Sequence, residues 1–336
     1  MYIMNNFIDE LKVKLMNEKN IGESSANLYI RNLVRLNDKK PFESLIFLKD
    51  LNDIESKLEK YSDNTKKTIL ASIVSILSLF KDTPSYKKIY KTYYDKMMTI
   101  GNDMKNIDTA TKTNKQKINW MTWEVITDIK NKLKEAVMKF SKNKTISENQ
   151  YQILLHYIIL LLYYDLPPRR NQDYQYMNFV SEYDDAPADI NLLDYKNKRF
   201  IFNKFKTNKK YGQQVVSFLP ENDDEKLKEF NEGLDIYLRF HPLNTKPNLK
   251  FNKNTSFPFL VYPSGNAFTQ VNSITRILNK IFQKNVSSSM LRHIYLSTKY
   301  NIDEMKKDAN DMGHSLNEQR QYMKDESETN QNIMRK

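Results

Sequence analysis

An almost uninterrupted apolar run, ILLHYIILLLYYDL at residues 153–166, constrains the fold of this chain more than any other feature. The run contains His156 and is shorter than the ~20 apolar residues that a bilayer-spanning helix needs. A helix that is apolar on all sides must be buried by the rest of its own domain. Residues 149–166 are therefore predicted to form a buried helix that ends before Pro167 and Pro168.

The patterns on either side of this run predict two domains, in line with ~150 residues per domain for a chain of 336 residues. Residues 1–107 carry apolar side chains at helical spacing and are predicted to form a small helical bundle. Its expected helices cover residues 3–18, a segment capped by Ser24 or Ser25, one or two pieces within 42–58, and residues 65–80 and 85–107. Residues 108–117, DTATKTNKQK, are almost entirely polar and are predicted to be a linker to a second domain at 118–336.

In the second domain, some segments carry apolar residues at helical spacing and others have the composition of strands. Helices are expected over 124–140 and 149–166, and again over 225–240, 270–283, 289–300 and 302–310. Between them, residues 200–202 and 215–219 are rich in strand-forming residues and flank a polar turn, which predicts a β-hairpin. Leu193 is expected in a third strand. The predicted fold class is mainly α with a small antiparallel β-sheet.

The composition excludes several kinds of chemistry. The chain has no cysteine, so a disulfide scaffold, a thiol nucleophile and a cysteine-based zinc site are ruled out. Its six glycines form no phosphate-binding loop of the GxGxxG or GxxxxGK[ST] type. The net charge of +12 is shared by residues 1–115 and residues 116–336. This favours an acidic partner such as nucleic acid, although a generally lysine-rich composition is an alternative explanation.

A set of basic residues and one tyrosine follows the apolar run in a characteristic order. An arginine pair follows the predicted helix in LLLYYDLPPRRNQDY, and lysines lie on the predicted hairpin in FNKFKTNKKYGQQVVSFLP. The sequences SMLRH at 289–293 and MGHS at 312–315 come next, and Tyr322 follows.

This order resembles the tyrosine recombinases, the integrase family whose catalytic fold is shared with type IB topoisomerases. In the family's first motif an arginine follows an apolar helix and an acidic residue stands three positions later. Arg170 and Asp173 match that spacing, and Arg169 is the alternative. The family's lysine lies on a β-hairpin, for which Lys206 is the first candidate and Lys209 the second.

The remaining motifs match with two departures. The family's His-x-Leu-Arg-His motif aligns with residues 289–293, so Arg292 matches the arginine and Ser289 replaces the first histidine. The Leu-Gly-His-Ser motif places His314, and the nucleophile would be Tyr322. Tyr322 follows His314 by eight residues, where nine is usual. The serine retains a hydrogen-bond donor for a phosphate but has no imidazole, so we expect it to reduce activity.

The resemblance implies a role for each of these residues. Arg170 and Arg292 would grip the non-bridging oxygens of a scissile phosphate, because a guanidinium binds such oxygens in bidentate fashion and stays protonated. Tyr322 would attack the phosphorus and form a 3′-phosphotyrosine link. Lys206 would protonate the departing 5′ oxygen as general acid, and His314 would hydrogen-bond the phosphate or shuttle a proton. This chemistry requires no cofactor and no metal.

The resemblance covers most of the chain. Residues 1–107 are similar to the family's core-binding domain, which holds DNA. Residues 118–336 are similar to its catalytic domain, the DNA breaking–rejoining fold, with a C-terminal tail. The PPRRNQDY motif and the richness in lysine and asparagine resemble integrases of large DNA viruses of protists and their virophages.

The function implied is that of a site-specific DNA recombinase or integrase acting on double-stranded DNA, as a homodimer on each site and a homotetramer in the synapse. Two alternatives stay open: a type IB topoisomerase-like enzyme that relaxes supercoils, and a catalytically weakened DNA-binding protein of recombinase ancestry. The start MYIMNNFIDELKVKL lacks the features of a signal peptide. We therefore expect a soluble intracellular protein without a membrane partner, located with its DNA in nucleus, cytoplasm, viral factory or virion.

Overall fold

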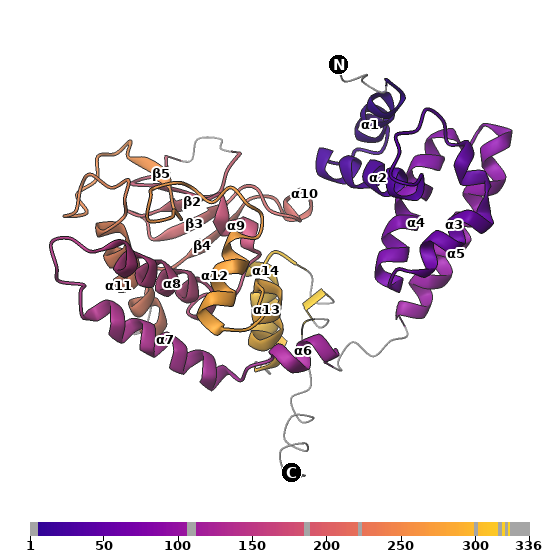
Figure 1. Cartoon of the computed structure of the whole chain (residues 1–336). Coiled ribbons are helices and arrows are strands. Elements are labelled where there is room, and N and C mark those ends of the chain that lie inside the picture. Colours follow the sequence, from indigo (N-terminus) through magenta and orange to yellow (C-terminus); the bar gives the residue numbers. More distant parts are fainter. Residues whose placement is uncertain are drawn as a thin grey trace, which may run out of the picture. The chain divides into compact units, whose positions relative to one another are not determined.

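The computed structural model describes residues 6–105, 112–184, 189–220, 224–298 and 302–314, together with 318–319 and 322. The chain divides into two compact units, Met1–Asp108 and Thr109–Lys336 (Figure 1). Each unit has its own hydrophobic core. The division falls at the start of the segment predicted as a linker. That segment is partly helical, because Thr113 caps a short helix, α6 (Asn114–Asn119), with its side chain.

The first unit is helical throughout its described residues. Its elements are α1 (Asn6–Glu18), α2 (Glu23–Leu36), η1 (Ile46–Lys49), α3 (Leu51–Glu59), α4 (Asp63–Leu77), η2 (Ser78–Phe80) and α5 (Pro84–Lys105). Ile69, Ile73 and Leu77 of α4 are fully buried, as their spacing of four residues predicts. Two details differ from the sequence prediction. The N-cap of α2 is Gly22 rather than Ser24 or Ser25. The helical spacing of Leu28, Leu33 and Leu36 predicts that they share one face, yet Leu28 faces outward with 37% of its surface exposed while the other two are buried.

The second unit is built around α8 (Glu148–Tyr164), the predicted buried helix. Ser147 and Gln150 form a capping box at its start, and eleven of its residues are buried. It packs against α7 (Trp123–Met138), α11 (Glu225–Arg239) and α12 (Ser273–Phe282) (Figure 1). The remaining helices are α9 (Asn171–Gln175), α10 (Asn208–Tyr211), α13 (Ser288–Ser297) and α14 (Ile302–Asp311).

The second unit also contains a five-stranded sheet in the order β4-β3-β2-β1-β5. The strands are β1 (Asn178–Val180), β2 (Leu192–Asp194), β3 (Arg199–Phe202), β4 (Gln214–Ser217) and β5 (Ser256–Pro258). The predicted hairpin corresponds to the antiparallel pair of β3 and β4, and the strand predicted at Leu193 is β2. The prediction of a purely antiparallel sheet was wrong, because β1 and β2 are parallel. Because β1 and β2 are parallel, residues 181–191 must return the chain to the end of the sheet at which β1 begins.

The fold is thus mainly helical with a small mixed sheet. Within the described ranges, no helix combines the length and the apolar character that crossing a bilayer would require.

Candidate functional site

The two neighbouring arginines predicted as alternatives have very different surroundings. Arg169 is buried, with 1% of its surface exposed, and its guanidinium stacks 3.7 Å from the centre of the Phe202 ring. Its Nε donates to Asp173 at 3.0 Å and its Nη2 donates to Gln214 of β4, also at 3.0 Å. Its Nη1 donates to the backbone carbonyl of Asp311, at the end of α14. Arg169 therefore holds three segments of the fold together, and its donors are occupied by protein groups.

Arg170 is half-buried and is the N-cap residue of α9. Its Nη1 lies 3.5 Å from the carbonyl oxygen of Gly313, which makes a long hydrogen bond. The side chain of Asn171 holds the backbone beside Arg170 in place, because it accepts from the Tyr163 hydroxyl at 3.0 Å and donates to the Thr275 hydroxyl at 2.7 Å. Arg170, unlike Arg169, is thus positioned at the Gly313 turn with its guanidinium partly accessible.

The turn at Gly313 is shaped by close packing. Gly313 has a φ of +71°, a conformation that side chains other than glycine's rarely adopt. A Cβ added there would lie 3.1 Å from the Phe205 ring and 3.3 Å from Arg169. The carbonyl of Gly313 also accepts from the Thr207 hydroxyl, one residue after Lys206. The hairpin turn and the arginine pair are thereby joined to the segment that carries His314.

Arg292 lies on α13 and is buried, with 5% of its surface exposed. Within the part of the chain that the structure describes, its Nε and Nη1 have no hydrogen-bond partner. A buried guanidinium with unused donors is uncommon, because each lost hydrogen bond to water is costly. Its charge also acts electrostatically on Asp173, which lies beside the arginine pair. These properties suit the binding of an anion.

Tyr322 lies next to Arg292 and two histidines. The centre of its ring is 5.0 Å from the Arg292 guanidinium carbon, 5.3 Å from the His314 ring and 4.9 Å from the His293 ring. The Nδ1 of His293 is hydrogen-bonded to the backbone carbonyl of Tyr322, which fixes the position of this residue. The eight-residue spacing between His314 and Tyr322 therefore still brings their rings together.

Lys206 lies next to Thr207, which contacts the Gly313 turn, and Ser289 lies on the same helix as Arg292. Lys206 is exposed in the turn that follows β3, and Lys209 is exposed in α10. Ser289 is half-buried near the start of α13, one helical turn before Arg292 and on a similar face. In the described ranges, neither Lys206 nor Ser289 makes a hydrogen bond or ion pair with Arg170, Arg292, His314 or Tyr322.

Burial and the neighbouring arginine charges shift the pKa of the Asp173 carboxyl group in opposite directions. Burial raises the pKa of Asp173 above its ordinary value, and the charges of Arg169 and Arg170 offset part of that effect. The acidic residue of the first motif thus interacts most closely with Arg169, which is four positions earlier, rather than with Arg170.

Three residues that hold the segments of the site together were not predicted to do so, namely Arg169, Thr207 and Gln214. Gln214 accepts from Arg169 and donates to the backbone carbonyl of Asn310 at 2.7 Å, so it links β4 to α14. The available sequence signals were a threonine directly after the candidate lysine and a second arginine beside the candidate arginine. Neither signal reveals a hydrogen-bond partner that lies about a hundred residues later in the chain.

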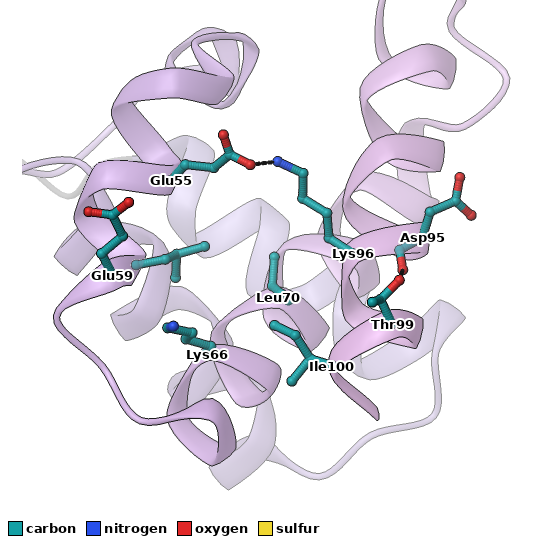
Figure 2. Close-up of a pocket in the computed structure, with 9 residues that line it drawn as sticks. Glu55, Glu59, Lys66, Leu70, Asp95, Lys96, Thr99 and Ile100 are labelled. Carbon is teal, nitrogen blue, oxygen red and sulfur yellow. Dashed lines mark hydrogen bonds and ion pairs between the residues drawn. The ribbon is translucent and has the colours of Figure 1, made fainter. Parts of the chain in front are cut away.

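The first unit contains a separate groove of about 570 Å³ (Figure 2). Its floor is apolar, with Leu58, Leu70 and Ile100, and Glu55 and Lys96 form an ion pair across it. No residue of the predicted site lies there. Considering only the residues that the structure places, no three histidine, cysteine or acidic side chains are arranged to hold a metal ion.

The described geometry brings Arg170, Arg292, His314 and Tyr322 into one region of the second unit, through the Gly313 turn and the Tyr322 ring. Such a group combines guanidinium donors that can bind an anion with a phenol hydroxyl and an imidazole. Comparisons with protein-family models, curated proteins and solved structures find no match to this chain.

Proposed function

We propose that this protein is a tyrosine recombinase that cuts and rejoins double-stranded DNA through a 3′-phosphotyrosine intermediate. The observation that carries the proposal is that Arg292, His314 and Tyr322 lie together, and that two donors of the buried Arg292 guanidinium have no partner among the described residues. In this proposal residues 118–336 adopt the DNA breaking–rejoining architecture and the first unit holds DNA. The enzyme acts as a dimer on each site and a tetramer in the synapse, wherever its DNA is located.

The proposed reaction uses each residue for a distinct step. Arg170 and Arg292 bind the non-bridging oxygens of the phosphate and stabilise the added charge of the transition state. The Tyr322 hydroxyl gives up its proton to solvent by way of His314, and its oxygen forms a bond to phosphorus as the bond to the 5′ oxygen breaks. Lys206 gives a proton to that 5′ oxygen, which requires its exposed side chain to turn toward bound DNA. Rejoining is the reverse attack by a 5′ hydroxyl, which releases the tyrosine.

The decisive experiment is to trap the covalent intermediate. The protein is incubated with a random-sequence pool of nicked duplexes, whose short cleaved fragment diffuses away and prevents rejoining. We expect a denaturant-resistant adduct between protein and DNA, and we expect Tyr322→Phe to abolish it because only the attacking oxygen is removed.

Two matched variants control this experiment. Tyr295→Phe tests a neighbouring tyrosine on α13, and Tyr176→Phe tests an exposed one outside the site. Both should keep the adduct. An adduct that survives Tyr322→Phe would show that the nucleophile is misassigned. DNA binding without any adduct would favour a DNA-binding protein that has lost catalysis. An adduct accompanied by supercoil relaxation without strand exchange would favour the topoisomerase-like alternative.

A further inference from the structure

The turn that follows β3 carries Lys206 between two residues that contact Gly313. Lys206 itself is exposed. On one side of it, the Phe205 ring is buried and lies so close to Gly313 that a Cβ added there would come within 3.1 Å of the ring. On the other side, the Thr207 hydroxyl donates to the Gly313 carbonyl. The backbone of Lys206 is therefore held from both sides beside the segment that carries His314.

Hydrogen bonds within the turn fix its shape. Asn191 lies just before β2, and its side chain accepts from the backbone N–H of Lys204 at 2.7 Å and donates to the Lys204 carbonyl at 2.9 Å. Further along, the backbone N–H of Asn208 donates to the Phe205 carbonyl at 3.1 Å. The turn is thus a preformed unit, and its contacts with Gly313 set where the whole turn lies relative to the site.

The Gly313 carbonyl serves as acceptor for two segments at once. The Nη1 of Arg170 lies 3.5 Å from this oxygen, and the Thr207 hydroxyl donates to the same atom. A carbonyl oxygen has two lone pairs and can accept both bonds. The turn that carries Lys206 and the arginine proposed to bind the phosphate are therefore placed relative to a single atom.

We propose that Thr207 is a positioning residue that holds the Lys206 ammonium group within reach of the departing 5′ oxygen, an assignment that rests on the proposed function. In the step concerned, the Tyr322 oxygen bonds to phosphorus and its proton leaves to solvent by way of His314. The bond between phosphorus and the 5′ oxygen breaks, and that oxygen takes a proton from Lys206. Thr207 acts through the position of Lys206 and not on the reacting atoms.

The flexibility of lysine explains why such a support matters. Its ammonium group stands on a flexible four-carbon stem, so the region that it can reach is set by the position of its backbone. A misplacement of about 1 Å in a reacting group can cost about a hundredfold in rate. Loss of the Thr207 hydrogen bond should therefore weaken proton transfer to the 5′ oxygen more than it weakens the attack by Tyr322.

The test compares two leaving groups. Two pools of nicked duplexes with random flanking sequence are prepared, one with natural DNA and one with sulfur in place of the 5′ bridging oxygen at one fixed scissile position. A thiol ionises with a pKa of about 8.5, far below that of an alcohol, so sulfur departs as a thiolate and needs no general acid. The measured quantity is the initial rate at which the full chain forms the covalent adduct with each pool.

Thr207→Val keeps the branched shape of the side chain and replaces its hydroxyl by a methyl group. We expect it to slow adduct formation with the oxygen pool at least about tenfold. With the sulfur pool its rate should stay within about threefold of the unmodified chain, because no proton is needed. Lys206→Ala should show the same pattern with a larger loss, about a hundredfold or more with the oxygen pool.

Two further variants separate positioning from a general effect on the fold. Thr207→Ser retains the hydroxyl and should restore most of the rate with the oxygen pool. Thr245→Val is the matched control, because it changes an exposed threonine in the loop after α11, and both of its rates should stay within about twofold.

The outcomes distinguish this inference from the proposed function. An unchanged rate of Thr207→Val with the oxygen pool, or an equal loss with both pools, would overturn the positioning role while the adduct of the unmodified chain still supported a recombinase. Failure of the unmodified chain to form an adduct with either pool would overturn the proposed function, and the role of Thr207 with it.

Discussion

Arg169 and Arg170 are adjacent in the chain, yet the fold uses them for different purposes. Arg169 is enclosed by Asp173, Gln214 and the Phe202 ring, whereas Arg170 is half-buried at the Gly313 turn. Sequence spacing to Asp173 favoured Arg170 for phosphate binding and left Arg169 as the alternative. The surroundings agree with that preference, because the nitrogens of Arg169 already donate to protein groups.

A second residue with unusual surroundings, Asp165, leads to a prediction on stability. The pKa of Asp165 is raised by burial to about 8 in the folded protein, against about 3.9 for an ordinary aspartate. Between these pH values the folded state holds a proton that the unfolded chain has released. The free energy of unfolding therefore falls as pH rises from 4 toward 8. Asp165→Asn lacks this penalty and should be more stable at pH 7, by on the order of a few kcal/mol.

Urea denaturation at pH 5, 6, 7 and 8 checks this prediction. The stabilisation by Asp165→Asn should grow steadily with pH, because above about pH 4 the unfolded aspartate is ionised whereas the folded one stays protonated up to about pH 8. Asp128→Asn, which removes an exposed carboxylate on α7, is the matched control variant. A stabilisation that is the same at pH 5 and pH 8 would mean that Asp165 is ionised in the folded protein.

The residue-scale predictions from sequence depended on motif order, and this explains what they missed. Order placed Arg292, His314 and Tyr322 in one constellation, and their side chains do lie together. It did not reveal that Thr207 donates to the Gly313 carbonyl, or that the Asp165 carboxyl group is buried with no hydrogen-bond partner among the described residues. Both features arise from contacts between segments distant in the chain, which no local pattern records.

At the scale of elements, the long periodic segments and the strands β2, β3 and β4 were predicted, whereas β1 and β5 were not. The apolar stripe of α4 identifies that helix by its helical period. The apolar run of α8 has no such period, but it is too long for a strand and so indicates a buried helix. The strands β1 and β5 were missed, since each has three residues and too few alternations to be recognised. The parallel pairing of β1 with β2 makes the sheet mixed, whereas β1 and β5 pair in antiparallel fashion.

The contact between α8 and α11 leads to a prediction at this scale. Gly233 of α11 faces α8, and a Cβ added there would lie 2.5 Å from Leu161 Cδ1 and 3.2 Å from the Tyr157 ring. Both of these side chains are fully buried and have little room to move. Gly233→Ala should therefore destabilise the second unit by about 1–3 kcal/mol through overpacking, despite the better helix propensity of alanine.

Gly101→Ala on α5 is the matched control for this measurement. Its Cβ would meet only the flexible end of Lys67, at 3.3 Å, so the gain in helix propensity of up to about 1 kcal/mol should dominate. Thermal unfolding of both variants compares the two effects. Equal or greater stability of Gly233→Ala would show that the packing between α8 and α11 is looser than the structure has it.

At the scale of the whole molecule, charge and architecture connect the proposed function to the two units. Each unit has its own core, and the net charge of +12 is distributed over both halves of the sequence. A protein that neutralises DNA phosphates releases condensed counterions, and its affinity then falls with salt by a slope of about −0.9 per phosphate contacted. If both units contact DNA, the full chain must have a steeper slope than either unit alone.

The salt dependence of binding can be measured without cleavage, and it tests the contribution of each unit. The full chain and a fragment of residues 112–336 are titrated by fluorescence anisotropy with a random duplex of about 30 base pairs, between 50 and 200 mM NaCl. Affinity of the full chain should fall at least about tenfold over this range, and the fragment should bind more weakly with a shallower slope. Tyr322→Phe in the full chain should leave the slope unchanged, since it removes no charge. Equal slopes for chain and fragment would exclude the first unit from DNA contact, and a flat dependence would contradict phosphate binding by either unit.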